Sequence, residues 1–358
     1  MNKKKALIIL PSYAIGGAEK VIWSYFKNFK NSNISLKLLV INAKDSYSNS
    51  KSKNIINLNF SRFIYAIPRV LSILRKKNIN VVISSFPNIS VGILCLKYLG
   101  LIKIKIIVRQ PNIIEKSLSG NIKLYTLKAL YKFFIKFVDA AIVTSEFMKN
   151  EILKYKLNSE KVFLIRNPIS IEETRKAITP VRQGTDKVRF IFVGRLVFQK
   201  GIDRILHIFA ANKDIELIIV GEGSFKSELL KIVKKLNIKD NIKFLGRIIR
   251  PYDLIAGSDY FILPSRWEGL PNCVLEALAL GTPVLSTKQI YSLNDFKKNI
   301  SNKSILLFNS ISELSKKINT LERRKDYKKP KLRNSLLINH TSPINFNKKI
   351  NEIILKIV

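Results

Sequence analysis

At 358 residues, 47% of them hydrophobic, the chain is long enough to form two domains, each with its own core. Its two cysteines, Cys95 and Cys273, lie far apart and outside any metal-ligand spacing, which excludes a disulfide framework. A formal net charge of +38 indicates an acidic partner, a biased genome or both, but no zinc-finger, RNA-recognition or K-homology signature supports a nucleic acid as that partner.

The amino terminus predicts a buried strand and not a targeting segment. Three lysines precede the apolar run Ala6–Leu10, but Pro11 ends that run and no cleavage region follows. The longest apolar candidate for a membrane span, Val91–Val108, is interrupted by lysines. We therefore expect a cytoplasmic protein that does not cross a membrane.

Short apolar runs alternate with longer amphipathic patterns along the chain. The first series of expected strands is Ala6–Leu10, Leu36–Ile41, Val81–Ser84, Ile104–Val108, Ala140–Thr144 and Val162–Ile165. The second series is Val188–Val193, Glu216–Val220, Ile242–Leu245, Tyr260–Leu263, Pro283–Ser286 and Ile305–Phe308. Helical patterns between them include Phe60–Lys77, Lys123–Phe137, Phe225–Leu236 and Pro271–Leu280. This alternation predicts parallel sheets covered by helices on both faces.

Two such series predict an α/β protein of two doubly wound, Rossmann-like domains. Pro168, Pro180 and Gly184 interrupt the periodicity between the series. The expected divisions are a basic N-terminal domain at 1–169, a linker at 170–187, a C-terminal domain at 188–343 and a final helix at 344–358, which fits either domain. Ligands of such sheets bind at the carboxyl ends of the strands, so two of these edges facing each other would form a cleft for two substrates.

The densest motif of the chain reads S-R-W-E-G-L-P-N-C-V-L-E at 265–276, directly after an expected strand. Gly269 permits a tight backbone turn, and Pro271 suits the first turn of a helix whose free amides attract an anion. Glu268 precedes this helix, and Glu276 lies about two turns into it. Inside a helix, Glu276 is either exposed or paired with hydroxyls, and sugar hydroxyls suit it because a carboxylate only accepts hydrogen bonds.

The wider pattern, S-x-x-E-G-x-P-x-x-x-L-E-A-x-A-x-G-x-P-V, resembles glycosyltransferase family 4 (glycosyl transferases group 1) of the two-domain GT-B fold. The resemblance implies a retaining enzyme that uses a nucleotide sugar, with UDP favoured over GDP, and a donor-binding C-terminal domain opposite an acceptor-binding N-terminal one. It also implies that Glu276 holds the donor ribose. The transferred sugar and the diphosphate are then held by Glu268 and the backbone of Gly269, Leu270, Pro271 and Asn272.

A basic loop follows the first strand of the second series and contains Gly194, Arg195 and Lys200. A diphosphate leaving group gathers negative charge, which Mg²⁺ held by paired carboxylates or else Arg and Lys must stabilise. The chain contains no Asp-x-Asp sequence, and its two histidines form no metal cluster. We therefore expect Arg195 and Lys200, which match the family's diphosphate-binding pair, to act without a metal or another cofactor.

Two glycine-containing loops also match the family. Gly16 and Gly17 open the first N-terminal helix, with Glu19 in its first turn, and the resemblance places this loop near the donor phosphates and the acceptor. On its own the sequence is neither a Rossmann nor a Walker fingerprint. Gly221 and Gly223 follow the second strand of the C-terminal series, where the resemblance places the nucleotide base.

The chain departs from the family at two positions. Many relatives carry a histidine near the 6-position of the sugar, where this chain reads Val108-Arg109-Gln110; a subgroup with arginine is closer, so Arg109 is expected to contact the donor or the acceptor. After Ser286 relatives usually continue with a glycine-rich loop that contacts the diphosphate. This chain has no glycine at 287–299.

The N-terminal half is strongly basic. Up to Ile169 the chain has 29 basic and 7 acidic residues, and no acidic residue lies between Asp45 and Glu115. Two of its helical patterns, Phe60–Lys77 and Asn121–Phe137, combine lysine or arginine with aromatic and aliphatic side chains. Such helices bind anionic membranes, although each apolar stripe alternatively faces the sheet while its lysines face water.

Together these patterns predict a peripheral membrane glycosyltransferase of the hexosyltransferase type. It would move a hexose or N-acetylhexosamine from a nucleotide diphosphate sugar to a lipid-linked, lipopolysaccharide or polysaccharide acceptor. Two alternatives share the fold: a nucleotide-sugar epimerase, which needs acid and base residues such as histidine, and a non-catalytic partner subunit. Intact Glu268, Glu276, Arg195 and Lys200 argue against a subunit that has lost activity.

Overall fold

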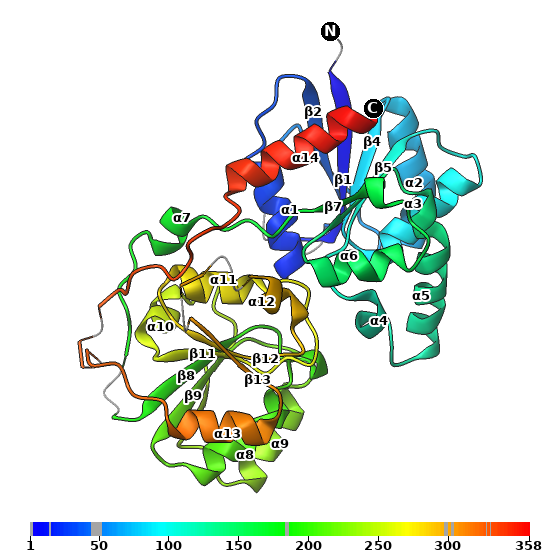
Figure 1. The fold of residues 1–358 in the computed structure, drawn as a ribbon. Helices are drawn as coiled ribbons and strands as arrows, with labels where there is room; N and C mark the ends of the chain where they lie inside the picture. Colours follow the sequence, from blue (N-terminus) through cyan, green and yellow to red (C-terminus); the bar gives the residue numbers. More distant parts are fainter. Residues whose placement is uncertain are drawn as a thin grey trace. The chain divides into compact units, whose positions relative to one another are not determined.

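The computed structural model describes residues 3–13, 16–43, 52–182, 186–296, 300–301, 304–326, 328–329 and 331–358. The chain divides into two compact units, one formed by Met1–Pro168 with Thr341–Val358 and the other by Ile169–His340. Each unit is an α/β layer structure built on its own parallel sheet (Figure 1). The two Rossmann-like folds predicted from the alternating patterns are therefore present.

Seven strands form the sheet of the first unit, in the order β3-β2-β1-β4-β5-β6-β7. They are β1 (Lys4–Ser12), β2 (Ile34–Asn42), β3 (Ile55–Asn57), β4 (Val81–Ser84), β5 (Lys105–Arg109), β6 (Ala140–Val143) and β7 (Val162–Leu164). The helices between them are α1 (Gly17–Lys27), α2 (Phe63–Lys76), α3 (Pro87–Tyr98), α4 (Ile114–Ser117), α5 (Ile122–Phe134) and α6 (Glu146–Leu153), with short 3-10 turns at Ile135–Phe137 and Ser159–Lys161.

Central strands are buried on both faces, as their continuous apolar runs predict. Residues 6–10 of β1 are all buried, and β1 pairs in parallel with β2 on one side and β4 on the other. The edge strand β3 was not predicted. It is three residues long, which is too short to show a periodicity, and it forms because its backbone completes the ladder beside β2.

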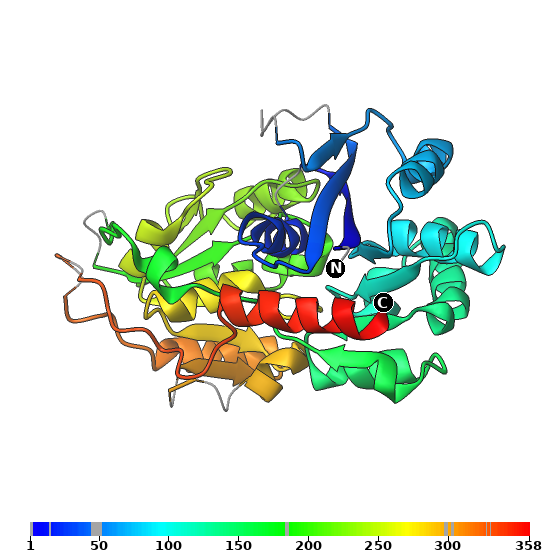
Figure 2. The ribbon, with the colours of Figure 1, turned by 90° about the horizontal axis from the view of Figure 1, so that it is seen from above.

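The final helix, α14 (Pro343–Ile357), belongs to the first unit, although the chain reaches it from the second. It packs against α1, as Figure 2 shows. Phe346 is fully buried in the core of this unit, and the buried Tyr25 hydroxyl of α1 donates a hydrogen bond to Asn351 Oδ1 at 2.7 Å. The apolar stripe of α14 therefore selects the first of the two domains that its pattern fits.

The sheet of the second unit has six strands in the order β10-β9-β8-β11-β12-β13. They are β8 (Val188–Val193), β9 (Ile215–Val220), β10 (Ile242–Phe244), β11 (Tyr260–Leu263), β12 (Val284–Thr287) and β13 (Ile305–Phe308). Its helices are α7 (Ile171–Arg175), α8 (Leu206–Ala211), α9 (Lys226–Lys235), α10 (Tyr252–Gly257), α11 (Asn272–Ala279), α12 (Tyr291–Phe296) and α13 (Ile311–Asn319), with 3-10 turns at Phe198–Lys200 and Ile202–Arg204.

The segment expected as a linker at 170–187 begins as part of this unit. Its first residues form α7, which packs against α11. The Arg175 guanidinium donates 2.8 Å hydrogen bonds to the carbonyls of Ala279 and Arg333, so the start of the segment is fixed to the domain it precedes. Residues 183–185 of the expected linker lie outside the described residues.

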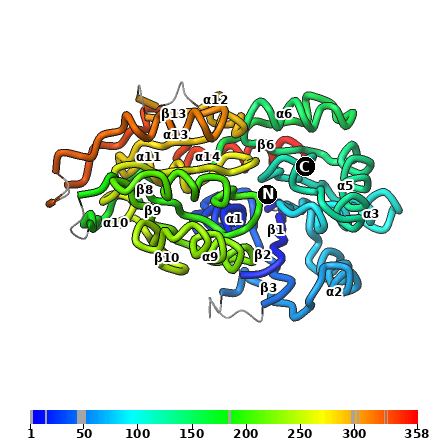
Figure 3. Tube along the Cα trace, turned by 90° about the horizontal axis from the view of Figure 1, so that it is seen from below, coloured from blue at the N-terminus to red at the C-terminus, as the bar shows by residue number. Residues whose placement is uncertain are grey.

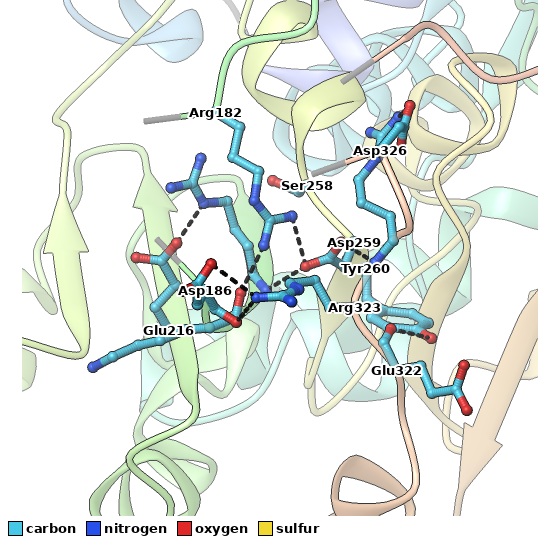
Figure 4. A network of polar contacts seen from close by, with 12 residues as sticks. Arg182, Asp186, Glu216, Ser258, Asp259, Tyr260, Glu322, Arg323 and Asp326 are labelled. Atoms are coloured by element: carbon cyan, nitrogen blue, oxygen red, sulfur yellow. Dashed lines mark hydrogen bonds and ion pairs between the residues drawn. The ribbon is translucent and has the colours of Figure 1, made fainter. Parts of the chain in front are cut away.

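Buried ion pairs occupy the amino edge of the second sheet (Figure 4). Arg189, at the start of β8, donates from Nε to Glu216 of β9 at 2.6 Å. Asp259, just before β11, accepts from Arg182 Nη1 at 2.8 Å and from two backbone amides, those of Arg189 and Arg324. Asp259 thereby connects the segment before β8 and the segment after α13 to the sheet.

In each sheet the order of the strands reverses at one pair of neighbouring strands, while all the strands stay parallel. The strand order doubles back between β1 and β4 in the first unit and between β8 and β11 in the second. At such a switch point the loops leave the carboxyl ends of the two strands in opposite directions, which opens a crevice for ligands. The candidate residues of each unit are therefore expected near these two places.

Candidate active site

Two loops at the carboxyl edge of the second sheet pack so closely that side chains are excluded between them. Gly221 has a φ of +148°, and a Cβ there would lie 1.8 Å from the Gly194 carbonyl oxygen. A Cβ on Gly223 would lie 2.2 Å from the Leu196 carbonyl oxygen. These glycines shape the loop after β8, which is a structural reason for them in addition to the nucleotide contact implied by resemblance.

Gly201 has the same function on the other side of the β8 loop. Its φ is +67°, and a Cβ there would lie 2.3 Å from the Pro264 carbonyl oxygen at the end of β11. The Arg266 amide also donates to the Gln199 carbonyl at 2.7 Å. This close approach carries Lys200, the last residue of the 3-10 turn, to the loop that holds Glu268.

Lys200 and Glu268 form the central ion pair of the site. Lys200 Nζ lies 2.5 Å from Glu268 Oε1, and the Glu268 side chain is only 9% exposed. Ser265 Oγ donates to the same carboxylate at 3.0 Å and Gln199 Nε2 at 3.3 Å. Sequence reasoning included Ser265 in the motif at 265–276 but gave it no role, and it missed Gln199, whose one signal is that it precedes Lys200.

The site brings two cations, Lys200 and Arg195, close to its carboxylates. Burial acts to lower the pKa of Lys200, but the adjacent Glu268 carboxylate outweighs it, so the pKa is raised above its usual value. The positive charge of Arg195 acts in the opposite sense, which shows that the two cations lie near each other. Arg195 itself is exposed to solvent. An exposed arginine beside a lysine that has N–H donors to spare suits an anionic ligand.

The backbone at 269–272 leads into α11, whose amino end has no side-chain cap. Pro271 is the N-cap residue and lies one position before the first turn, in which it was expected. Gly269 does not have the positive φ that its expected tight turn suggested. The Ser292 hydroxyl of α12 instead holds the Gly269 carbonyl by a short hydrogen bond. The segment after Ser286, which departs from the family pattern, thus supports the motif directly.

Glu276 is buried on α11, and the Tyr252 hydroxyl of α10 donates to its Oε1 at 3.4 Å. Cys273 lies between the two glutamates of the motif. Burial of its thiol raises the pKa to about 12, and the charges of Lys200, Glu268 and Glu276 all act on it. Cys273, to which the sequence assigned neither a disulfide nor a metal, therefore lies among the predicted site residues.

The remaining candidates lie at the carboxyl edge of the first sheet. Gly16 is the N-cap residue of α1, and the Glu19 carboxylate folds back over it, since a Cβ on Gly16 would lie 2.3 Å from Glu19 Oε2. Arg109 ends β5 and is buried, with its Nη2 donating to Asn167 Oδ1 at 2.5 Å. Burial lowers the pKa of Arg109 to about 10, against the opposing effect of Glu19.

The structure therefore gathers the candidates into two groups. The second unit brings together Arg195, Lys200, Glu268, residues 269–272 and Glu276, close to the switch point between β8 and β11. The first unit brings Gly16 and Glu19 near Arg109. Across the described ranges, no group of three or more His, Cys, Asp or Glu side chains is arranged to hold a metal ion.

Two family models match the chain, one to each half. Residues 15–173 match the model described as glycosyltransferase family 4, and residues 174–353 match the model described as glycosyl transferases group 1. An uncharacterized glycosyltransferase of Methanocaldococcus jannaschii is 30% identical over 312 residues, which cover 80% of this chain and 75% of the relative. The capsular polysaccharide biosynthesis glycosyltransferase CapH of Staphylococcus aureus is 25% identical, covering 68% of this chain and 70% of CapH.

Among solved structures, HepE of Anabaena in complex with UDP-glucose has the same fold. The TM-score is 0.76 at 16% sequence identity, and the match covers 98% of this chain and 99% of HepE. At this identity the likeness concerns the arrangement of the two Rossmann-like units. The sequence matches, which span both units, carry the family assignment.

Proposed function

Because the chain belongs to the glycosyl transferases group 1 family, we propose that it transfers a hexose or N-acetylhexosamine from a nucleotide diphosphate sugar, with UDP as the nucleotide, to a lipid-linked, lipopolysaccharide or polysaccharide acceptor. The observation that carries the proposal is the Lys200–Glu268 pair beside the exposed Arg195, at the switch point of the second sheet. CapH, a relative that builds capsular polysaccharide, supports the acceptor class.

The charges of the site suit the departure of a nucleoside diphosphate. As the bond between the sugar C1 and the phosphate oxygen breaks, negative charge develops on the leaving group, and cations held in place stabilise it. Lys200 has three N–H donors and uses one of them on Glu268, while Arg195 projects into solvent. We propose that these two cations bind the diphosphate without a metal, while Gln199 and Ser265 keep Glu268 aligned for the sugar hydroxyls.

We propose that the transfer retains the anomeric configuration. The acceptor hydroxyl attacks C1 on the face that the diphosphate leaves, and a diphosphate oxygen takes the proton of that hydroxyl. Glu268 is paired with Lys200, and we assign it to the sugar hydroxyls and not to a covalent intermediate. The product anomer, determined by NMR, tests this step, and an inverted anomer would contradict it.

Glu276 is proposed to hold the donor ribose. Its carboxylate already accepts a hydroxyl hydrogen bond from Tyr252, although at 3.4 Å this bond is long. A ribose offers two neighbouring hydroxyls to the same acceptor. In the first unit, Gly16 and Gly17 are proposed to approach the donor phosphates, and Arg109 and Glu19 are proposed to contact the sugar or the acceptor.

We also propose that the first unit rests on an anionic membrane through α5 and the end of α3, which pack side by side (Figure 3). Exposed apolar side chains on this surface are Tyr98, Leu99, Ile122, Tyr125, Leu130 and Phe133. Lysines accompany the rings: Lys128 Nζ lies 4.9 Å from the Tyr125 ring centre, and Lys136 Nζ lies 4.4 Å from that of Phe133. Aromatic side chains interleaved with lysines are typical of helices that bind anionic lipid surfaces.

The bilayer is proposed as a docking surface only. Within the described ranges, no helix combines the length and the apolar character that crossing a bilayer requires. Sedimentation with vesicles tests the contact: we expect binding to phosphatidylglycerol–phosphatidylcholine vesicles and weaker binding after Ile122→Ser or Phe133→Ser. Ile249→Ser, at an exposed position in the second unit, is the control. Equal binding of all variants would contradict the assignment of this surface.

The decisive experiment measures nucleotide release. Purified protein is incubated with UDP-, GDP- and ADP-sugars, with membrane lipid extract and with EDTA present. We expect release that depends on one donor and on the lipid, and that Arg195→Ala and Glu276→Ala abolish. Release that needs no lipid would point to an epimerase or a water-soluble acceptor. Silence across the panel, with nucleotide binding also lost, would favour a non-catalytic subunit.

A further inference from the structure

The first unit buries a cation that its own side chains leave incompletely satisfied. Arg109 is 1% exposed, and its Nη2 donates to Asn167. Among the described residues, its Nε and Nη1 have no hydrogen-bond partner. A buried donor without an acceptor costs free energy, and a charged one costs more than a neutral one. A guanidinium with unused donors on two of its three nitrogens is therefore poised to bind acceptor oxygens.

A second unsatisfied group lies beside Arg109. Ser84, the last residue of β4, pairs with Val108 of β5, so Ser85 and Arg109, the residues that follow, lie at neighbouring positions of this edge. Ser85 is 2% exposed, and its Oγ likewise has no partner in the described part of the chain. Two adjacent buried donors without acceptors point to a ligand oxygen that they share.

Gln110, the residue after Arg109, belongs to a polar group whose hydrogen bonds are made within the protein. Gln110, which points away from Arg109, donates to Glu151 Oε2 at 2.7 Å and accepts from the Tyr131 hydroxyl at 3.4 Å. The Glu151 carboxylate also accepts from the backbone amides of Ile114 and Glu115, at the start of α4. In that group the protein supplies its own anion.

Two helix ends add to the positive field on the face of Arg109. α1 follows β1 and α3 follows β4, the two strands of the switch point, and neither helix has a side-chain cap at its amino end. The positive ends of helices favour anions. Glu19 contributes some compensating charge, yet burial still lowers the pKa of Arg109 to about 10.

We propose that Arg109 and Ser85, at the switch point of the first sheet, form a binding subsite for a carboxylate or phosphate group. The anion belongs either to the donor sugar or to the acceptor, which makes one of the two substrates acidic. The origin of the anion rests on the proposed function, but the existence of the subsite does not. Both side chains are buried, so covering residues must move for binding, and inorganic phosphate is a suitably small probe.

The subsite is tested by thermal unfolding of the full chain in phosphate and in chloride of matched ionic strength. Lys200→Ala is used as the background, because Lys200 offers phosphate a second site. We expect phosphate to raise the melting temperature of this background by about 2–5 °C. Adding Arg109→Gln removes the shift. Adding Arg75→Gln, which removes an exposed arginine from the same unit, leaves the shift in place.

Arg109→Met keeps the test decisive if Arg109→Gln fails to fold. It replaces an incompletely paired buried charge by an apolar chain of similar length, so we expect a fold at least as stable as the parent. Loss of the phosphate shift in this variant supports the subsite. No phosphate shift in the Lys200→Ala background, or a shift that persists without Arg109, would overturn it.

Kinetics then identify the substrate that carries the anion. UDP-glucuronate is compared with UDP-glucose, which differs only at C6, and a diphospholipid-linked sugar is compared with the same sugar as a neutral glycoside. We expect Arg109→Gln to lower kcat/KM by roughly 10- to 100-fold, mainly through KM, for the acidic member of one pair only. An equal loss with every substrate would show a structural role and overturn the proposal. Absence of any turnover would count against the proposed function and leave the phosphate result standing.

Discussion

The two edges of the second sheet use ionic side chains in opposite ways, although the same strands supply both. At the amino edge, Arg189 starts β8 and Asp259 precedes β11, and each lies in a buried network with a partner of opposite charge. At the carboxyl edge, Lys200 and Glu268 are paired as well, but Arg195 stands beside them exposed. At the amino edge both arginines are paired inside the protein, whereas Arg195 at the carboxyl edge is open to solvent.

We interpret the difference as a division between ion pairs that stabilise the fold and charged side chains that bind a ligand. A buried pair is costly to break, because the surviving charge loses both its partner and its solvent. An exposed cation at a switch point contributes little to stability, and it forms an ion pair when an anionic ligand binds. Arg109 in the first unit belongs with the second kind, since it is buried and still has unused donors.

Of the further variants that compare the two edges, Lys200→Ala at the carboxyl edge is expected to have the largest effect. If Lys200 stabilises the leaving diphosphate, its removal lowers kcat by about 10²–10³-fold. The free energy of unfolding also falls, but we expect a smaller loss than for a fully buried pair, because Glu268 keeps the hydrogen bonds from Ser265 and Gln199. Turnover with the donor that the nucleotide-release panel identifies, measured together with urea unfolding, checks both parts. Lys231→Ala, at an exposed position on α9, is the matched control. A similar kcat in both variants would contradict the role of Lys200.

Asp259→Ala at the amino edge is expected to show the reverse behaviour. It leaves Arg182 without its carboxylate partner and removes acceptors from two backbone amides, so the free energy of unfolding falls by about 3–5 kcal/mol. The melting temperature then falls by roughly 6–20 °C, measured by calorimetry. Asp240→Ala, at an exposed position, is expected to change stability by less than about 0.5 kcal/mol. Equal stability of the two variants would break the distinction between the edges.

Gly221→Ala is expected to affect stability and activity together. Its Cβ collides with the Gly194 carbonyl oxygen and its φ disfavours any side chain, so the loop that carries Arg195 must move, at a cost of at least about 2 kcal/mol. Gly100→Ala shares the positive φ but meets no atom within 4 Å, and should cost only about 1 kcal/mol. Urea unfolding and turnover of both variants give the comparison. An active, stable Gly221→Ala would show that the loop tolerates displacement.

Glu276→Gln is expected to weaken donor binding by about tenfold, with little change in kcat at saturation. The amide keeps a hydroxyl acceptor but loses the charge, and a charged hydrogen bond exceeds a neutral one by about 1–1.5 kcal/mol. Calorimetric titration with the nucleotide, and with the same nucleotide lacking its ribose hydroxyls, measures the effect. If both ligands bind the variant and the parent alike, Glu276 does not hold the ribose.

The smallest effect concerns the thiol among the charges of the site. Because burial raises the pKa of Cys273 to about 12, the thiolate is scarce at pH 9, and its fraction keeps rising tenfold per pH unit up to that value. We expect alkylation of Cys273 by iodoacetamide, followed by mass spectrometry, to be at least tenfold slower at pH 9 in the folded chain than in urea. A rate that levels off below pH 9 would show a thiol in a more polar setting.

The sequence by itself determined the strands of both sheets, β3 excepted, and the family, and it proposed the candidate site residues. All twelve predicted strands are present, because buried parallel strands are continuous apolar runs and the period of a pattern is a local property. The spacing of Glu268 and Glu276 and the loop with Arg195 and Lys200 likewise lie within short stretches of chain. Sequence reasoning found these residues because each stretch carries its own signal.

Only the tertiary structure decided which residues meet. Lys200 and Glu268 lie 68 positions apart, and they pair because Gly201 lets one loop approach the end of the strand that precedes the other. The adjacency of Ser85 and Arg109 depends on the register between β4 and β5, and the choice of unit for the final helix depends on which core its apolar stripe covers. Such contacts join segments distant along the chain, so no local pattern encodes them, and packing of the complete sheets fixes them.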